Sequence, residues 1–190
     1  MILGCFQSNK GLRDLEYRTF VKHVVELGYA AVDLPLAEAN SAEFCRELGL
    51  HIHSAGPLFL PEMSTDDTQQ EALAAQVIAA IDVAAAQSIP TITSLVGRCP
   101  ALNGDDNVAL FRDLFTPLAA HAETRGVKLA FENWPRNNTM FGTTPETWDA
   151  MFNAVPSPAL GLCYDPSHFY WQGIEYIQPI WDFHDRIYHA

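Results

Sequence analysis

The sequence predicts an α/β fold with a parallel sheet, a (β/α)8 barrel truncated after the start of its seventh strand. Strand-like apolar runs alternate with helix-like segments along the whole chain, an order typical of parallel strands joined by helices. Two acids, Glu132 and Asp165, each end one of these runs. The chain has 190 residues, whereas a complete barrel of this kind usually needs about 250.

Seven strands are expected where short apolar or β-branched runs are bounded by turn residues. They cover residues 2–6, 30–34, 50–54, 91–96, 127–132, 160–164 and 186–189. Helices are expected over residues 13–27, 42–48, 67–87 and 107–125, in a segment that Thr144 opens, and over 174–183. A longer loop is expected after residue 54, because Gly56, Pro57 and Pro61 interrupt the strand pattern.

Two helix ends follow from local chemistry. Apolar residues at helical spacing in the segment 13–27 run to Leu27, and Gly28 follows where a helix end favours a left-handed residue. Thr144, Pro145 and Glu146 supply an N-cap, a proline at the first helical position and an acid in the first turn. The sequence therefore places a helix start at this point.

The alternative to a barrel is a complete doubly wound sheet. No glycine-rich phosphate-binding fingerprint follows the first predicted strand, so a dinucleotide-binding fold gains no support. We expect a single domain over residues 1–190 that is C-terminally incomplete, because a barrel open at this point exposes strand edges and its apolar interior.

The net charge and the lengths of the apolar runs bear on whether the protein binds nucleic acid or a membrane. Lys and Arg number 11 against 23 Asp and Glu, a net charge of −12. Such a field repels phosphate backbones, so nucleic acid is not an expected partner. No apolar run reaches the roughly 18 residues that span a bilayer, so no membrane association is expected. The composition is compatible with a homo-oligomer.

The four cysteines are scattered, with no CxxC pair. This usage fits reduced thiols in a cytosolic protein better than a disulfide framework. The first residues lack the charged-then-apolar layout of a signal peptide. We therefore expect a cytoplasmic protein.

Strand alternation gives an internal check on the two acids. If Glu132 points into the barrel, so does Ala130, and if Asp165 does, so does Cys163. Each acid then lies two positions above a small inward residue, and the bulkier residues face the helices: Phe131 and Tyr164. A lone acid at a strand end is most often an exposed loop acid or a helix cap. The matched pattern favours a shared site, because consecutive strand ends meet on one rim of a parallel barrel.

Histidines near this rim are further candidates. His168 lies three residues past Asp165, on the loop that is expected to leave the sixth strand. It could reach a metal ion or a substrate, or it could cap the next segment. Oxygen and imidazole ligands that converge at one rim indicate a divalent metal.

Two other histidines and an aromatic residue are candidates for substrate binding. His53 is closer than His51 to the end of the third strand, and His189 is expected to share the inward face of the seventh strand with Ile187. Trp134 follows the fifth strand on the same rim, where an aromatic ring can wall the pocket of a small polar ligand. For His53 and Trp134 the competing interpretation, packing without function, carries about equal weight.

Several segments resemble the xylose isomerase-like TIM barrel superfamily, and its sugar phosphate isomerase/epimerase branch in particular. They are residues 26–34, 129–133, 160–168 and 185–190. The resemblance implies that Glu132 and Asp165 ligate a divalent metal (Mn²⁺, Mg²⁺, Co²⁺ or Zn²⁺). It implies that His168 contacts the substrate or a second metal. His189 would match the first residue of the family's His-x-His pair; the second histidine and a fourth ligand, a glutamate on strand eight, would lie beyond Ala190.

The resemblance also implies a reaction. The substrate would be a sugar, a sugar derivative or a small hydroxy-carbonyl compound, deprotonated next to its carbonyl to give an enediolate. Glu132 would move the proton on one face, and the missing glutamate would serve the other. The sequence leaves isomerase and epimerase open, and residues 1–190 alone are not expected to turn over substrate.

Three alternatives remain open. A metal-dependent hydrolase of the endonuclease IV type would need an additional histidine after the fourth strand, and residues 91–98 contain none. An inosose-type dehydratase would also begin with loss of a carbon-bound proton. A non-catalytic sugar- or metal-binding relative would keep the ligands without turnover.

Overall fold

Seven parallel strands form one sheet in the computed structural model, which describes residues 2–7 and 11–190. The strands are β1 (Gly4–Cys5), β2 (Ala31–Leu34), β3 (His51–Glu62), β4 (Thr91–Gly97), β5 (Lys128–Glu132), β6 (Leu160–Cys163) and β7 (Ile187–His189). They neighbour one another in the order of the sequence, and every pairing is parallel. A doubly wound sheet would reverse its strand order part-way across. The strands therefore form an open (β/α)8-type barrel with β1 and β7 as its edges.

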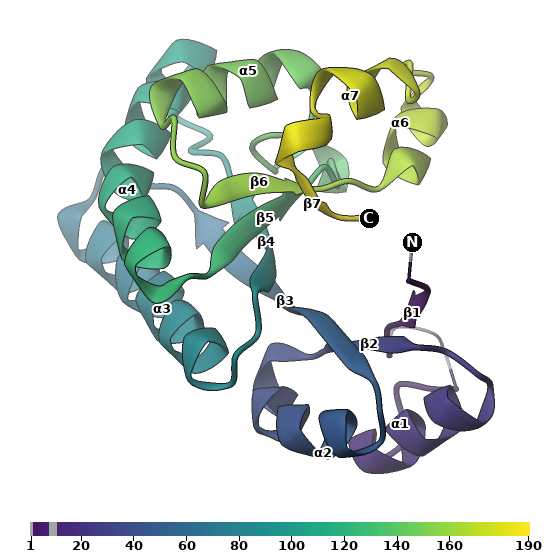
Figure 1. Cartoon of the computed structure of the whole chain (residues 1–190). Helices are drawn as coiled ribbons and strands as arrows, with labels where there is room; N and C mark the ends of the chain where they lie inside the picture. Colours follow the sequence, from purple (N-terminus) through teal and green to yellow (C-terminus); the bar gives the residue numbers. More distant parts are fainter. Residues whose placement is uncertain (1, 8–10) are drawn as a thin grey trace.

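The helices lie on the outer side of the curved sheet, and both termini lie near its two edges, on one side of the molecule (Figure 1). They are α1 (Tyr17–Glu26), α2 (Ala42–Glu47), α3 (Asp67–Ala86), α4 (Gly104–Arg125), α5 (Pro145–Ala154), α6 (Pro166–Gln172) and α7 (Gln178–Asp182). Three short 3-10 helices are η1 (Leu36–Ser41), η2 (Arg136–Asn138) and η3 (His184–Arg186).

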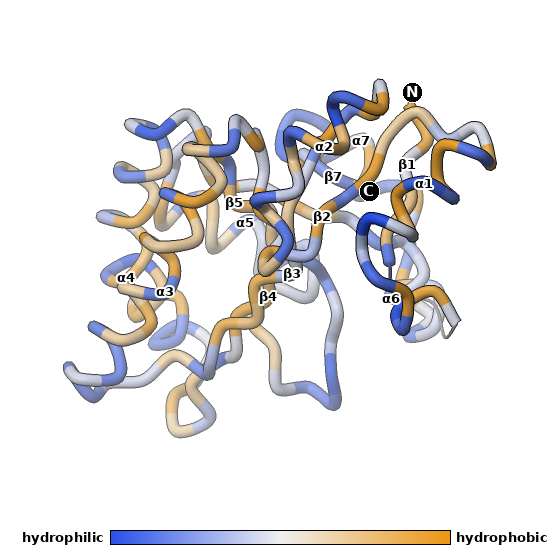
Figure 2. The backbone as a smooth tube through the Cα atoms, turned by 90° about the horizontal axis from the view of Figure 1, so that it is seen from below, coloured by the Kyte–Doolittle hydropathy of each residue, from blue (hydrophilic) through white to orange (hydrophobic). Residues whose placement is uncertain are grey.

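The core lies between the sheet and these helices. Phe131 of β5 packs edge-on against Phe111 and Phe115 of α4, at centroid distances of 5.8 and 5.4 Å. Tyr164, just after β6, packs in the same manner on Trp148 of α5 at 5.9 Å. The residues that precede Glu132 and Asp165 therefore face the helices, as strand alternation predicts. Along α3 and α4 the hydrophobic residues alternate with hydrophilic ones (Figure 2).

The third strand is much longer than the sequence pattern predicts, and the loop expected after residue 54 is wrong. β3 continues to Glu62 because its backbone pairs with β4 as far as the Glu62–Gly97 pair, with two register shifts on the way. Gly56 lies at one of these irregularities, with φ at 156°. A Cβ at this position would lie 2.1 Å from Oγ1 of Thr93, so the two strands can approach here only because Gly56 has no side chain.

The chain after β6 also differs from the prediction. A helix, α6, begins directly after Asp165, where a loop is expected. Asp165 is its N-cap, and its Oδ1 accepts a hydrogen bond from the Ser167 N–H at 2.8 Å. Pro166 occupies the first helical position and Gly173 ends the helix in the left-handed region, with φ at 68°. The single helix expected over residues 174–183 is confined to α7.

The expectation about the inward face of the seventh strand is wrong. Ile187 does not share the inward face with His189, because the register shifts between them: Ile187 pairs with Leu162 and His189 with Cys163. Ile187 packs against the main core.

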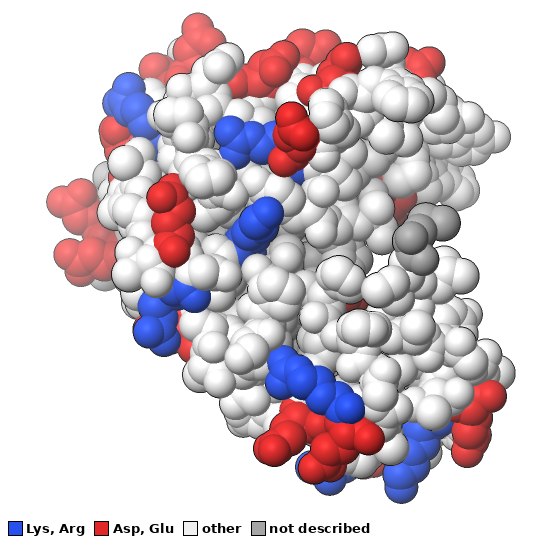
Figure 3. Space-filling model, viewed as in Figure 1, with Lys and Arg blue, Asp and Glu red and all other residues white. Residues whose placement is uncertain are grey.

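The surface is acidic overall, with a net charge of −12. On the face shown in Figure 3, acidic and uncharged side chains separate the basic ones, and the molecule is hollowed on the side where β1 and β7 lie. In the part of the chain that the structure describes, no helix has the length and apolar character of a membrane span.

Candidate metal centre

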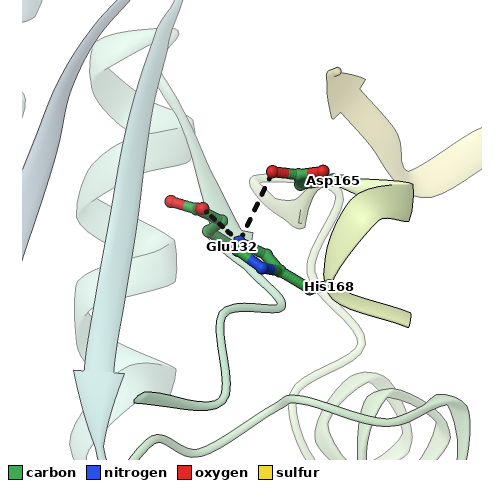
Figure 4. Close-up of side chains that lie close together, drawn as sticks. All are labelled: Glu132, Asp165 and His168. Atoms are coloured by element: carbon green, nitrogen blue, oxygen red, sulfur yellow. Dashed lines mark hydrogen bonds and ion pairs between the residues drawn. The ribbon is translucent and has the colours of Figure 1, made fainter. Parts of the chain in front are cut away.

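Glu132, Asp165 and His168 converge at the carboxyl ends of β5 and β6. His168 Nε2 lies 3.0 Å from Oε1 of Glu132 and 3.4 Å from Oδ2 of Asp165 (Figure 4). One ligand atom from each of the three residues lies within 4.8 Å of the others. The sequence prediction that these residues meet on one rim agrees with this geometry.

Neighbouring strands and one helical turn create this cluster. Glu132 is the last residue of β5 and pairs with Cys163 of β6, so Asp165 follows only two residues beyond that pair. Asp165 is the N-cap of α6, and His168 lies in the first turn of this helix rather than on a loop as expected. Because residues three apart lie on the same face of a helix, the His168 imidazole is close to the carboxylate of Asp165, the N-cap of the same helix.

Asn133 fixes the second acid relative to the first. Its amide group donates to the Asp165 carbonyl and accepts from the Asp165 N–H, both at 2.9 Å, and the residue is fully buried. This pair of bonds replaces the ladder between β5 and β6 at the position where both strands have ended. The separation of Glu132 and Asp165 is therefore set by a buried contact.

The donor set fits a divalent ion. Two carboxylates side by side repel each other unless a proton or a cation lies between them, and here the His168 ring nitrogen lies within reach of both. The Glu132 and His168 side chains are only 22% and 20% exposed, and Asp165 is 41% exposed. Carboxylate oxygens with one imidazole nitrogen suit Mn²⁺, Mg²⁺, Co²⁺ or Zn²⁺.

A cavity of about 520 Å³ opens beside the cluster. Glu132 and Asp165 line it, together with polar residues of the barrel interior: Asp33, Ser54, Thr93, Cys163 and His189. This volume is within the range of small-molecule sites. His189, predicted to bind substrate, therefore faces the same space as the two acids.

His53 lies elsewhere. It lines a neighbouring hollow of about 360 Å³ with Asp33 and His189, and Glu132 is not part of that hollow. The register shift in the pairing of β2 with β3, between Val32 and Leu34, brings both His53 and Ser54 opposite Asp33. Ser54, one residue nearer the strand end, lines the cavity with Glu132 instead.

Trp134 stands behind the cluster rather than inside the cavity. Its ring stacks on the His168 ring at a centroid distance of 6.5 Å. Phe59 of β3 packs edge-on against the Trp134 ring at a centroid distance of 6.5 Å, and the Arg136 guanidinium lies 5.7 Å from the Trp134 centroid. Trp134 therefore restricts the orientation of the His168 imidazole.

Asp33 is the interior residue that the sequence reasoning missed. Its Oδ1 accepts from the Ser54 hydroxyl at 2.8 Å, and its Oδ2 lies 3.0 Å from His189 Nε2. A signal was present, because Asp33 interrupts an apolar strand between Val32 and Leu34. An acid at such a position needs partners inside the protein.

These carboxylates set the protonation of their neighbours. The hydrogen bond to Asp33 raises the pKa of His189 above its ordinary value, against the effect of burial, and the charges of Asp33 and Glu132 add to this. Burial raises the pKa of the Cys163 thiol strongly, and the three nearby carboxylates raise it further. Cys163 is therefore a neutral thiol and a poor nucleophile. All four cysteines are free.

Comparison with known proteins agrees with this architecture. The family described as xylose isomerase-like TIM barrel matches residues 21–190. No curated protein matches the sequence.

Solved structures with the same fold include two sugar epimerases and one epimerase-like protein, all of low sequence identity to this chain. D-allulose 3-epimerase from Methylomonas sp., in complex with D-allulose, is 19% identical with a TM-score of 0.73, over 90% of this chain and 63% of that one. 3-keto-D-glucoside 4-epimerase from E. coli is 15% identical with a TM-score of 0.78, over 100% and 77% of the two chains. A D-tagatose 3-epimerase-like protein is 14% identical with a TM-score of 0.79, over 100% and 74%.

At these identities the likeness to solved structures shows the fold. The present chain spans 63% of the length of the allulose epimerase. The family match covers most of the sequence, and the strand order agrees with it. The chain belongs to the xylose isomerase-like TIM barrel family.

Proposed function

We propose that this protein is a divalent-metal-dependent isomerase or epimerase that acts on a sugar, a sugar derivative or a small hydroxy-carbonyl compound through an enediolate. The observation that carries the proposal is the cluster of Glu132, Asp165 and His168 beside a cavity of about 520 Å³. Proteins of the same fold that act as epimerases on D-allulose and on a 3-keto-D-glucoside support the substrate class.

Glu132 and Asp165 would hold the metal ion, with His168 as a third ligand or as a contact to substrate. Bound there, the ion would supply positive charge that stabilises the negative charge developing on substrate oxygens. His168 Nε2 lies within hydrogen-bond distance of Glu132 and close to Asp165, so the imidazole keeps the two carboxylates together.

Glu132 is the residue that would move the proton. A proton leaves the carbon next to the substrate carbonyl and passes to a carboxylate oxygen of Glu132, leaving the enediolate. Its return to the neighbouring carbon gives the isomer, and delivery of a proton to the opposite face of the same carbon gives the epimer. Trp134, stacked on His168, keeps the imidazole in place during this transfer.

Solvent exchange tests this chemistry. Purified full-length protein with Mn²⁺ and D-fructose or D-allulose in D₂O should place deuterium on the carbon next to the carbonyl, which NMR detects. Glu132→Gln should abolish the exchange, because an amide cannot take the proton. Glu47→Gln, an exposed acid on α2, is the matched control and should leave the exchange unchanged.

The same experiment separates the competing reactions. Turnover that leaves every carbon-bound hydrogen in place would indicate a hydride shift or a hydrolysis and would contradict the enediolate. Incubation with an inosose would show loss of water if the protein is a dehydratase.

The cytoplasmic location inferred from the cysteines stays a prediction.

A further inference from the structure

A chain of polar side chains crosses the barrel interior and joins four strands. The Ser54 hydroxyl of β3 donates to Asp33 Oδ1 of β2 at 2.8 Å. Asp33 Oδ2 lies 3.0 Å from His189 Nε2 of β7, and His189 Nδ1 lies 3.6 Å from the Cys163 Sγ of β6. Asp33 and His189 are 156 residues apart in the sequence, so the fold alone brings them together.

This arrangement fixes the orientation of the His189 ring. Asp33 has no proton to donate when ionised, so the bond requires a hydrogen on Nε2. Both oxygens of Asp33 have partners, and the Asp33 and His189 side chains are only 18% and 19% exposed. Nδ1 is left with a thiol at 3.6 Å, which is a weak partner. Nδ1 is therefore the nitrogen of His189 that can exchange its contact for a ligand.

The ring faces the space that Glu132 and Asp165 share. His189, Asp33 and Cys163 all line the cavity of about 520 Å³ beside the metal centre. We propose that Asp33 is the positioning residue of the active site, which holds His189 so that its Nδ1 makes a hydrogen bond with a substrate hydroxyl. The substrate part of this inference rests on the proposed function, whereas the contact between Asp33 and His189 does not.

Nitrogen-15 NMR of histidine-labelled protein tests the positioning role directly. We expect His189 to carry a proton on Nε2 and to show one fixed ring state near neutral pH. Asp33→Asn should change the chemical shifts of both ring nitrogens, because an amide holds the Nε2 proton less strongly than a carboxylate does. Asp185→Asn is the matched control, because Asp185 makes the same kind of contact with His184 but is 88% exposed; it should leave the His189 signals unchanged. An unprotonated Nε2 in the wild type, or unchanged signals in Asp33→Asn, would overturn the proposal.

Deuterium exchange into D-fructose supplies the functional readout. Asp33→Asn and His189→Gln should each lower kcat about tenfold or more, the scale of a lost charge-assisted hydrogen bond, and the double variant should be no slower than the slower single variant. Additive losses would show that the two residues act separately and would overturn the proposal. Asp33→Glu, which keeps the carboxylate, should recover part of the rate. If the full-length wild type exchanges no deuterium, the proposed function fails, and the NMR experiment still decides the role of Asp33.

Discussion

Asn133 is a single buried amide that sets the spacing of two candidate metal ligands. It directly follows Glu132, and its side chain pairs with both backbone polar groups of Asp165. Neither backbone group of Asp165 has a ladder partner on β5, because that strand ends at Glu132. The side chain therefore extends the sheet by one pair of hydrogen bonds, at the place where a small change in separation would alter the metal centre.

Replacing Asn133 with Ala should affect both stability and metal binding. The Asp165 N–H and C=O would lose their partners inside the protein, so the free energy of unfolding should fall by about 1–3 kcal/mol. Mn²⁺ affinity should fall about 10- to 100-fold, as it does when a supporting contact of a ligand is lost. Urea denaturation and titration calorimetry measure the two effects. Asn153→Ala, at an exposed position on α5, should change neither quantity, and unchanged Mn²⁺ affinity in Asn133→Ala would contradict this account.

The pair of Asp33 and His189 predicts a pH-dependent contribution to stability. Because the folded protein raises the pKa of His189, it binds this proton more tightly than the unfolded chain does. The contribution is therefore fully present below the unfolded pKa of about 6.5 and is lost as pH rises through the folded pKa. The stability difference between wild type and His189→Gln, from urea denaturation, should shrink as the pH rises above about 6.5. His184→Gln, at an exposed histidine, is the control, and a difference that grows with pH would contradict the assignment.

Residues on adjacent strand ends could be predicted, and contacts across the barrel could not. Glu132 and Asp165 follow from a topological rule, since parallel strands end on one rim. Asp33 meets His189 through the curvature of the whole sheet, which no local pattern records. His53 lines the neighbouring hollow because a register shift in the β2–β3 pairing changes which residues face each hollow, and such shifts carry little local signal.

At the level of the elements, the close approach of β3 to β4 requires a glycine at position 56. Gly56 lies at a register shift, where a Cβ would overlap with Thr93. Gly56→Ala should destabilise the protein by about 2 kcal/mol or more, from backbone strain and from overpacking. The urea midpoint should fall with an unchanged slope. Gly104→Ala, at the start of α4 with no atom within 4 Å of the new Cβ, should be neutral or stabilising; equal effects of the two substitutions would show that close packing at Gly56 is not the cause.

Most elements could be predicted because their signals are local. The Thr144 cap, the proline after it and the apolar strands required only neighbouring residues. α6 has the same chemistry as α5, an N-cap at Asp165 and a proline at the first helical position, and the rule that located α5 would have located it. The extension of β3 could not be predicted in this way, because Pro57 and Pro61 usually interrupt strands and only pairing with β4 maintains the strand through them.

At the scale of the whole molecule, strand order and charge favour the same site. Strands that neighbour one another in sequence order bring every strand end to one rim, so Glu132, Asp165 and the interior carboxylate of Asp33 share one cavity. The net charge of −12 adds a long-range field that attracts cations and repels anions. A divalent ion at the cluster would therefore neutralise repulsion that the folded protein carries without it.

That repulsion predicts metal-dependent stability. An ion that binds only the folded protein stabilises it by RT ln(1 + [L]/Kd), about 2.7 kcal/mol at one hundred times Kd. For a protein of 190 residues, each kcal/mol raises Tm by about 2–4 °C, so saturating Mn²⁺ should raise Tm by about 5–10 °C. Calorimetry of the metal-stripped protein, with Mn²⁺ added in steps, measures the shift. Glu132→Gln and Asp165→Asn should each remove most of it, whereas Glu47→Gln should retain it. A shift of equal size in all three variants would place the ion elsewhere, because a nonspecific response to the acidic surface would not depend on two particular carboxylates.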